Sequence, residues 1–118
     1  MQLRLTYSRK KIMKIIEVKK FSKYPGPRYK KLGEYSGEEF RDEVLAPALK
    51  QGDVSVDFDG VYGYGSSFLE EAFGGLVRKG IATDRMVFLK DHLKCEDDPS
   101  IVVEVKKYIN EALSGRTS

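Results

Sequence analysis

The chain has 118 residues and a formal net charge of +3; 41% of its residues are hydrophobic and 33% are charged. This length and apolar content fit one folded domain and exclude a wholly disordered chain. The single cysteine, Cys95, excludes an internal disulfide framework, and with a single histidine, His92, it argues against zinc sites built from these residue types.

No apolar run approaches the ~18 residues that a bilayer-spanning helix needs. The N-terminus is basic but lacks the apolar stretch of a signal peptide. We therefore expect a cytoplasmic protein with no membrane segment. The composition also gives no reason to expect a bound cofactor.

Positive charge is concentrated in residues 1–31, which hold eleven basic residues and one acidic residue, a net charge of +10. The rest of the chain has ten basic and seventeen acidic residues, a net charge of −7. The basic residues are interleaved with Tyr7, Phe21, Tyr24 and Tyr29. Phosphate contacts combined with aromatic stacking would bind single-stranded nucleic acid in a salt-dependent way. Nucleic-acid binding through residues 1–31 is therefore an alternative function, although no known nucleic-acid-binding motif is present.

The sequence predicts a basic N-terminal extension at residues 1–12, followed by a single domain at residues 13–118. The β-branched residues 15–18 predict a strand. Residues 24–27 predict a loop, because two prolines cannot continue a ladder of backbone hydrogen bonds. A second, weaker strand is expected at residues 28–32.

Ser36 and Glu39 have the spacing of a capping box, which predicts the start of a helix. An apolar stripe then continues until Gly52 ends the helix. Pro47 lies inside this helix and removes one hydrogen bond, so we expect a kink or break near residues 44–46.

Residues 54–58 alternate between apolar and polar and predict a strand with one buried face. A glycine-rich segment follows, and Ser67 with Glu70 repeats the capping-box spacing at the start of a second helix. Gly74 and Gly75 inside this helix each cost ~1 kcal/mol relative to alanine. We attribute them to close packing of the helix on the sheet.

Residues 86–89 predict the next strand, and Asp98 as N-cap with Pro99 in the first turn then starts a terminal helix. The inner face of this helix consists of Ile101, Val105, Tyr108, Ile109 and Ala112. The alternation of strands and helices predicts an α/β fold, with a single mixed β-sheet and about three helices packed mainly on one face.

Residues 59–67 connect the end of a strand to the start of a helix, where open α/β sheets bind ligands and partners. Glu70 and Glu71 follow in the first turn and would repel a free phosphate ligand. Ser67 has the spacing to cap the helix, whereas we expect Ser66 to be exposed at the loop tip. Phosphorylation of Ser66 beside these glutamates would disrupt an interface more readily than create one. From the spacing alone, the favoured interpretation is that both serines only cap the helix and turn the chain.

Four segments carry the signature of a family: residues 57–61 (Asp-Phe-Asp-Gly-Val), 65–76, 36–41 (Ser-Gly-Glu-Glu-Phe-Arg) and 45–49. Together they resemble a STAS-like family of unknown function, over roughly residues 13–113. That family is related to the sulphate-transporter and anti-sigma-factor-antagonist (STAS) domains. These are small cytoplasmic α/β domains that bind a switch kinase and are controlled by phosphorylation of a serine in a strand-to-helix loop.

The resemblance implies that Ser66 is the phosphoacceptor, with Ser67 as the second candidate. It implies a non-catalytic regulatory module that binds a histidine-kinase-like ATPase or an anti-sigma-type regulator. The expected partner surface is the loop of residues 59–67 with the helix that follows. Its expected contact residues are Asp59, Gly60, Tyr62, Tyr64, Gly65, Phe68 and Glu71.

An enzymatic alternative uses the same strand end, because Asp57 and Asp59 also resemble the paired aspartates of haloacid-dehalogenase-type phosphatases. In those enzymes the two carboxylates act as nucleophile and acid–base. The reaction also needs a lysine, for which Lys90 or Lys94 is a candidate. It further needs an acidic pair for magnesium, and residues 96–98 (Glu-Asp-Asp) have that composition. The chain is short for this fold, so we favour the binding module.

Overall fold

Among residues 13–115, which are those that the computed structural model describes, three strands form one parallel sheet. The strands are β1 (Met13–Glu17), β2 (Asp53–Asp57) and β3 (Leu93–Lys94), with β2 in the centre. The predicted basic extension, residues 1–12, lies outside the described residues. The predicted α/β class is confirmed, although the described strands are all parallel where we expected a mixed sheet.

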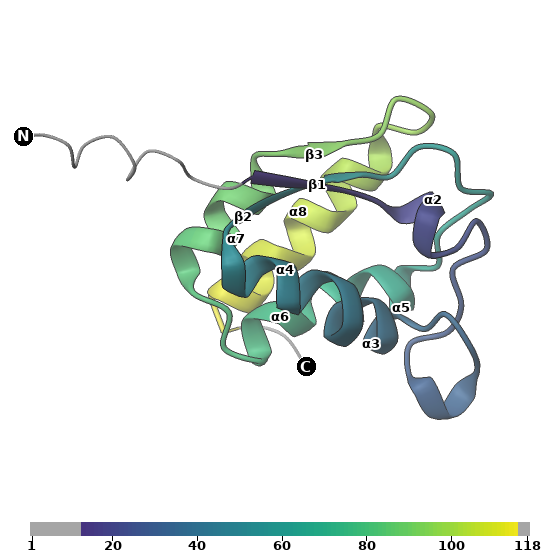
Figure 1. Ribbon diagram of the computed structural model, residues 1–118, viewed down its shortest axis with the longest axis horizontal. Helices are drawn as coiled ribbons and strands as arrows, with labels where there is room; N and C mark the ends of the chain where they lie inside the picture. The colour runs from purple at the N-terminus through teal and green to yellow at the C-terminus, as the bar shows by residue number, and fades with distance from the viewer. Residues whose placement is uncertain (1–12, 116–118) are drawn as a thin grey trace, which may run out of the picture.

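The register of the sheet places its apolar residues on one face. Ile16 of β1 pairs with Val56 of β2, and both are buried, as is Val54. Ile15, which points to the opposite face, is 61% exposed. Figure 1 shows the helices on the buried face. The predicted one-sided packing of the sheet is therefore confirmed.

The helical segments, in chain order, are α2 (Val18–Phe21), the 3₁₀ turn η1 (Lys30–Leu32), α3 (Gly37–Phe40), the π-helical turn η2 (Arg41–Leu45), α4 (Ala46–Gln51), α5 (Ser66–Leu69), the π-helical turn η3 (Glu70–Gly74), α6 (Gly75–Arg78), α7 (Thr83–Lys90) and α8 (Ser100–Leu113). Two long helices are thus each assembled from three consecutive segments: α3–η2–α4 and α5–η3–α6. Both carry a π turn at mid-length. Such turns are rare in proteins, and those that occur often lie at functional sites.

The helix α3–η2–α4 begins as the sequence predicts. The Ser36 side chain accepts a hydrogen bond from the backbone N–H of Glu39 at 3.0 Å, which confirms the cap. The helix does not break near Pro47. Instead its π turn, η2, ends directly before α4, so the irregularity lies where the proline removes a hydrogen bond.

The weaker strand predicted at residues 28–32 is wrong. This segment contains the 3₁₀ turn η1, and the carbonyls of Pro27 and Arg28, which precede η1, accept hydrogen bonds from the first turn of α3. The Pro27 carbonyl accepts from Gly37 N–H at 2.9 Å, and the Arg28 carbonyl accepts from Glu38 N–H at 3.0 Å. Helix N-termini leave such N–H groups without internal partners, so the loop is held by the helix and not by the sheet.

The strand predicted at residues 86–89 is also wrong, because these residues form the second half of α7. Met86 and Leu89 are both fully buried, and their spacing of three residues fits one face of a helix. The strand lies just beyond, at β3, where Val56 N–H donates to the His92 carbonyl at 3.1 Å.

The terminal helix α8 is present as predicted but begins one residue later, with Pro99 as its N-cap in place of Asp98. The Asp98 side chain still accepts hydrogen bonds from the backbone N–H and the hydroxyl of Ser100. Ile101, Val105 and Ile109 are buried against the core. No helix among the described residues has the length and apolar character needed to cross a membrane.

Phenylalanine rings occupy the centre of the core beneath the sheet. Phe58, directly after β2, packs against Phe73 with ring centroids 5.5 Å apart. Phe40 packs against both Phe68 and Phe73. All four rings are almost completely buried, and loss of such a ring typically costs about 3–5 kcal/mol. This cluster joins the two long helices to the sheet end where the loops begin.

Candidate functional site

The loops that follow the three strands gather at one end of the molecule, on the right in Figure 1. Parallel strands share one carboxyl edge, and ligands of open α/β folds bind at this edge. Backbone hydrogen bonds join the predicted 59–67 loop to both neighbouring loops. Tyr62 N–H donates to the Lys23 carbonyl at 3.0 Å, and Gly60 N–H donates to the Asp97 carboxylate at 3.0 Å.

Asp59 fixes the turn at the end of β2. Its N–H donates to Asp57 Oδ1 at 2.9 Å, and its Oδ1 accepts from Asp97 N–H at 2.8 Å. Lys94 Nζ lies 3.4 Å from Asp59 Oδ2 and 3.6 Å from Asp57 Oδ2. The backbone hydrogen bond from Asp97, followed by those of Glu96 and the Lys94 ammonium, holds the pKa of Asp59 below its ordinary value. The Asp59 carboxylate therefore stabilises the turn through these contacts with Asp97 and Lys94.

Gly60 shapes the loop through its backbone. Its φ of +85° lies in the left-handed region that side chains disfavour. A Cβ at this position would also lie 2.8 Å from Lys19 Cδ, but this flexible side chain can move away. The positive φ is therefore what favours glycine here, immediately before the exposed part of the loop.

Tyr62 and Tyr24 form a stacked pair on the surface. Their ring centroids are 4.7 Å apart with an interplanar angle of 6°, and the residues are 75% and 69% exposed. A hollow of about 290 Å³ beside the pair is lined by Lys23, Gly60, Val61 and Tyr62. Large exposed tyrosines are typical of binding-site centres, because they bury much area at a low cost in conformational entropy.

The second half of the loop is anchored in the core, which corrects the prediction for Tyr64 and Phe68. The Tyr64 hydroxyl donates to the Phe58 carbonyl at 2.7 Å, and its ring packs edge-on against Phe58. Burial raises the pKa of Tyr64. Phe68 is fully buried among aromatic rings. Both residues hold the loop in place from below, so neither can form the predicted partner surface directly.

The helix after the loop begins two residues earlier than predicted, with Gly65 as its N-cap in place of Ser67. Ser67, predicted as the cap, is instead an exposed residue of the first turn. The Ser66 hydroxyl donates to Glu104 Oε2 of α8 at 2.6 Å. Ser66 is exposed, as expected, but its hydroxyl is engaged by a carboxylate that lies 38 residues away in the sequence.

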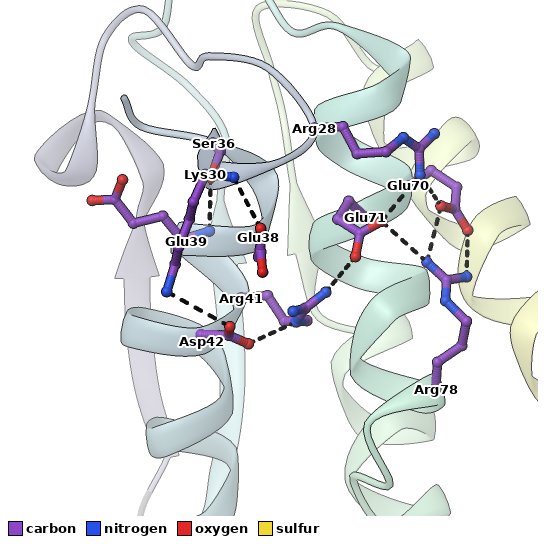
Figure 2. A network of polar contacts seen from close by, with 10 residues as sticks. All are labelled: Arg28, Lys30, Ser36, Glu38, Glu39, Arg41, Asp42, Glu70, Glu71 and Arg78. Atoms are coloured by element: carbon purple, nitrogen blue, oxygen red, sulfur yellow. Dashed lines mark hydrogen bonds and ion pairs between the residues drawn. The ribbon is translucent and has the colours of Figure 1, made fainter. Parts of the chain in front are cut away.

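Glu71, also predicted as a partner contact, is 8% exposed and lies inside an ion-pair network (Figure 2). Its Oε2 accepts from Arg41 Nη1 at 2.5 Å, and Arg41 is only 3% exposed. Arg41 Nε also donates to Asp42 at 2.8 Å. Burial opposes the charge of Arg41, but these hydrogen bonds outweigh burial and raise its pKa. Glu71 is therefore a bridge between the long helices and not a surface contact.

Two further arginines complete this network from opposite sides. Arg28, from the loop after β1, donates to Glu70 at 2.7 Å and to Glu71 at 3.1 Å. Arg78 of α6 donates to both carboxylate oxygens of Glu70, at 2.7 and 3.0 Å. Burial of Glu70 is outweighed by these arginines, so its pKa is lowered. The network ties the first loop to the helix that starts at Ser66.

The network also explains the paired glycines, which we had attributed to close packing on the sheet. A Cβ at Gly75 would lie 2.8 Å from Arg41 Nη1 and 3.0 Å from Arg41 Cδ. A Cβ at Gly74 would lie 2.6 Å from Glu70 Oε2. The glycines therefore make room for the arginine and the glutamate, and the sheet is not the neighbour that requires them.

The residues of the phosphatase alternative are only partly brought together. Lys94 lies beside Asp57 and Asp59, as that alternative requires. Lys90 instead donates to Asn110 at 3.0 Å, and Asp98 caps α8. Among the described residues, no three or more histidine, cysteine, aspartate or glutamate side chains are grouped so as to hold a metal ion.

The described part of the basic segment is largely paired with carboxylates of the same chain. Lys19 and Lys20 lie 3.5 and 3.2 Å from Glu17. Lys30 lies 3.6 Å from Glu43 and 3.8 Å from Asp42. The excess charge of residues 13–31 is thus partly neutralised where it meets the acidic body.

Residues missed by the sequence reasoning fall into two groups. Arg28 and Arg41 were not singled out because nothing local distinguishes them from exposed cations. Glu104 was missed because its role depends on a contact between α8 and α5. The one local signal was the pair Gly74 and Gly75, whose cost in a helix indicates that a bulky group lies against it.

A model of one protein family, described as a STAS-like domain of unknown function, matches residues 36–94. The match covers half of the chain, from the cap of α3 to the end of β3, and includes the loop and both π turns. No curated protein and no solved structure gave a significant match.

Proposed function

This chain belongs to the STAS-like domain family of unknown function, and we propose that it is a non-catalytic regulatory module that binds a protein partner. The partner surface in this proposal is narrower than the sequence suggested. It consists of the exposed part of the 59–67 loop, the adjoining loop with Tyr24, and the exposed start of the following helix. Phe68 and Glu71 are left out because they are buried, and Tyr64 because it anchors the loop.

The stacked pair of Tyr24 and Tyr62 is the observation that carries the proposal. Two tyrosines that are each more than two-thirds exposed are held in a fixed geometry by a backbone hydrogen bond between their loops. A preformed aromatic surface loses little freedom on binding, and such residues dominate the energy of many interfaces. The turn at Gly60 before Tyr62 and the anchoring of Tyr64 in the core after it keep this pair in place.

A non-catalytic role is supported by the use of the acidic residues at this edge. Asp57, Asp59 and Asp97 each accept hydrogen bonds from backbone N–H groups of the loops. Their carboxylates thus stabilise the turns that present the tyrosines. This arrangement suits a rigid recognition surface better than a site with a free nucleophile and a free acid–base group.

The family relationship suggests the kind of partner: a histidine-kinase-like ATPase or an anti-sigma-type regulator. It also suggests control through Ser66, which lies at the start of α5, four residues after Tyr62. A phosphoryl group on Ser66 would place nearly two negative charges beside the Glu104 carboxylate, and we expect it to release the partner.

The test is affinity purification of the tagged chain from its native host, with mass spectrometry of bound proteins and of the Ser66 peptide. The proposal expects a protein partner that is retained by Ser66→Ala and lost with Ser66→Asp. Ser67→Asp is the matched control, because it adds the same charge at the next, exposed position. Equal retention by all variants would contradict the switch, and the absence of any specific protein would contradict the module.

The same pair of rings supports a second candidate, single-stranded nucleic acid. Bases stack on exposed aromatic rings, and Lys23 lines the hollow beside Tyr62. Binding of this kind weakens steeply with salt. A fluorescent oligonucleotide titrated at low and moderate salt would show such binding, and Tyr62→Ala would reduce it. Salt-independent or undetectable binding would remove this candidate.

A further inference from the structure

We infer that Glu104 and Tyr108 of α8 form a latch on Ser66 that a negative charge on Ser66 opens; its role in partner release rests on the function proposed above. Ser66 Oγ and the Tyr108 hydroxyl both donate to the same oxygen, Glu104 Oε2, each at 2.6 Å. The latch therefore joins the first residue of α5 to α8.

The contact between Ser66 and Glu104 is well placed to hold the first turn of α5 against α8. Glu104 and Tyr108 are separated by one turn of α8, and Val105 between them is fully buried. Glu104 and Tyr108 are half-buried, and the hydrogen bond between them is partly shielded from water, whereas the hydrogen bond between Ser66 and Glu104 is exposed. Burial, together with the hydrogen bond to Glu104, raises the pKa of Tyr108, which keeps its hydroxyl protonated as a donor.

Phosphorylation changes both the charge and the hydrogen bonding of Ser66. Transfer from a nucleoside triphosphate forms a bond between Ser66 Oγ and the γ-phosphorus and breaks the bond to the β–γ bridging oxygen. The nucleoside diphosphate leaves, and the hydroxyl proton is released. Ser66 then no longer donates to Glu104, and its dianion lies against the Glu104 carboxylate.

Opening of the latch changes the partner surface directly, because the exposed first turn of α5 is itself part of that surface. Gly65, which precedes Ser66, has open space where a side chain would lie, so the chain can move there. Tyr64 and Phe68 stay anchored in the core on either side, so the shift is confined to the first turn of α5.

A double-mutant cycle on the purified chain tests the latch without any partner. Ser66→Asp is made in the natural background and in Glu104→Gln, which keeps the shape of the glutamate but removes its charge. Urea unfolding at low salt gives the equilibrium constant for unfolding of each variant. Ser67→Asp is the matched control, since an acid in the first turn of a helix is ordinarily neutral or stabilising.

The latch predicts that Ser66→Asp raises the unfolding constant about threefold or more in the natural background, and that Glu104→Gln abolishes this effect. Ser67→Asp shows no such dependence on Glu104. Equal effects of Ser66→Asp in both backgrounds, or no effect in either, would overturn the latch.

Hydrogen exchange gives a second test with an uncharged variant. Ser66→Ala removes the donor, so we expect the backbone amides of the first two turns of α8 to exchange several times faster than in the natural chain. Ser67→Ala should leave them unchanged. Unchanged exchange in Ser66→Ala would contradict the latch. If the double-mutant cycle shows the coupling but the tagged chain captures no specific protein from its host, only the proposed function is contradicted.

Discussion

Arg41 and Glu71 form a buried ion pair, with Nη1 and Oε2 2.5 Å apart, between the π turns of two neighbouring helices. Arg41 lies in η2 and Glu71 in η3, so each residue sits where its helix departs from regular geometry. A π turn changes the direction of the side chains around it, and here both turns direct a charged group into the interface. Asp42 and Arg28 supply the remaining hydrogen bonds.

Removal of one partner of this pair should destabilise the fold strongly. Glu71→Ala leaves the Arg41 guanidinium buried without its main acceptor, and we expect a loss of about 3–5 kcal/mol in the free energy of unfolding. Urea unfolding followed by circular dichroism measures this loss. Glu43→Ala, an exposed glutamate of the same helix pair, should cost less than about 1 kcal/mol. Similar losses for both variants would show that the pair does not hold the helices together.

The glycine pair should respond unequally to alanine. In an ordinary helix interior, glycine to alanine stabilises by roughly 1 kcal/mol. Gly75→Ala places a methyl group against the pinned Arg41, so we expect a net loss of about 1–3 kcal/mol. Gly74→Ala meets the ends of the Glu70 and Arg78 side chains, which lie nearer the surface and can move, and it should be much closer to neutral. Stabilisation by Gly75→Ala in thermal unfolding would contradict the assigned role of this glycine.

Much of the fold could be predicted from local pattern. Period-two alternation identified β2, the Ser36 cap located α3, and the apolar spacing of Ile101, Val105 and Ile109 identified α8. These elements were predictable because a single buried face dictates their residue pattern. The identity of α7 was mistaken because a short apolar run fits both a strand and a helix, and its true partners lie elsewhere in the chain.

The candidate site was predictable only in part. The loop after β2 is recognisable from its glycines and its place at a strand end, and Ser66 is at the helix start as expected. The tyrosine pair and the Glu104 contact were not, because each joins residues 38 positions apart. Tyr64 and Tyr62 alternate in sequence with glycine and look equivalent, yet only the structure shows that one is anchored and the other is exposed.

We expect the free energy of unfolding to fall at low pH as the Asp59 carboxylate becomes protonated. Its folded-state pKa lies below that of the unfolded chain, about 3.9, because N–H groups and Lys94 stabilise the carboxylate. The stabilisation is therefore fully present above about pH 4–5 and is lost as the pH falls through the folded-state pKa. Asp59→Asn should flatten the decline in unfolding free energy below pH 4, while Glu96→Gln, an exposed neighbour, should not. Parallel declines in Asp59→Asn and the natural chain would contradict this role.

The two loop tyrosines should differ when their hydroxyl groups are removed. Tyr64→Phe leaves the Phe58 carbonyl without its donor in a half-buried position, and we expect a loss of about 1 kcal/mol. Tyr62→Phe removes a hydroxyl from an exposed ring and should leave the unfolding free energy unchanged. Chemical denaturation of both variants measures the difference. Equal values would mean that the Tyr64 hydroxyl does not anchor the loop.

The most direct test of the binding module compares an exposed tyrosine of the loop after β2 with an exposed apolar residue outside the proposed surface. Tyr62 is 75% exposed, and Val87, in α7, is 42% exposed. The tagged natural chain, Tyr62→Ala and Val87→Ala are purified from the native host, and bound proteins are quantified by mass spectrometry. We expect one protein partner that is retained by Val87→Ala and reduced about tenfold or more by Tyr62→Ala. Equal recovery of that partner with both variants would place the interface elsewhere and contradict the proposed binding surface.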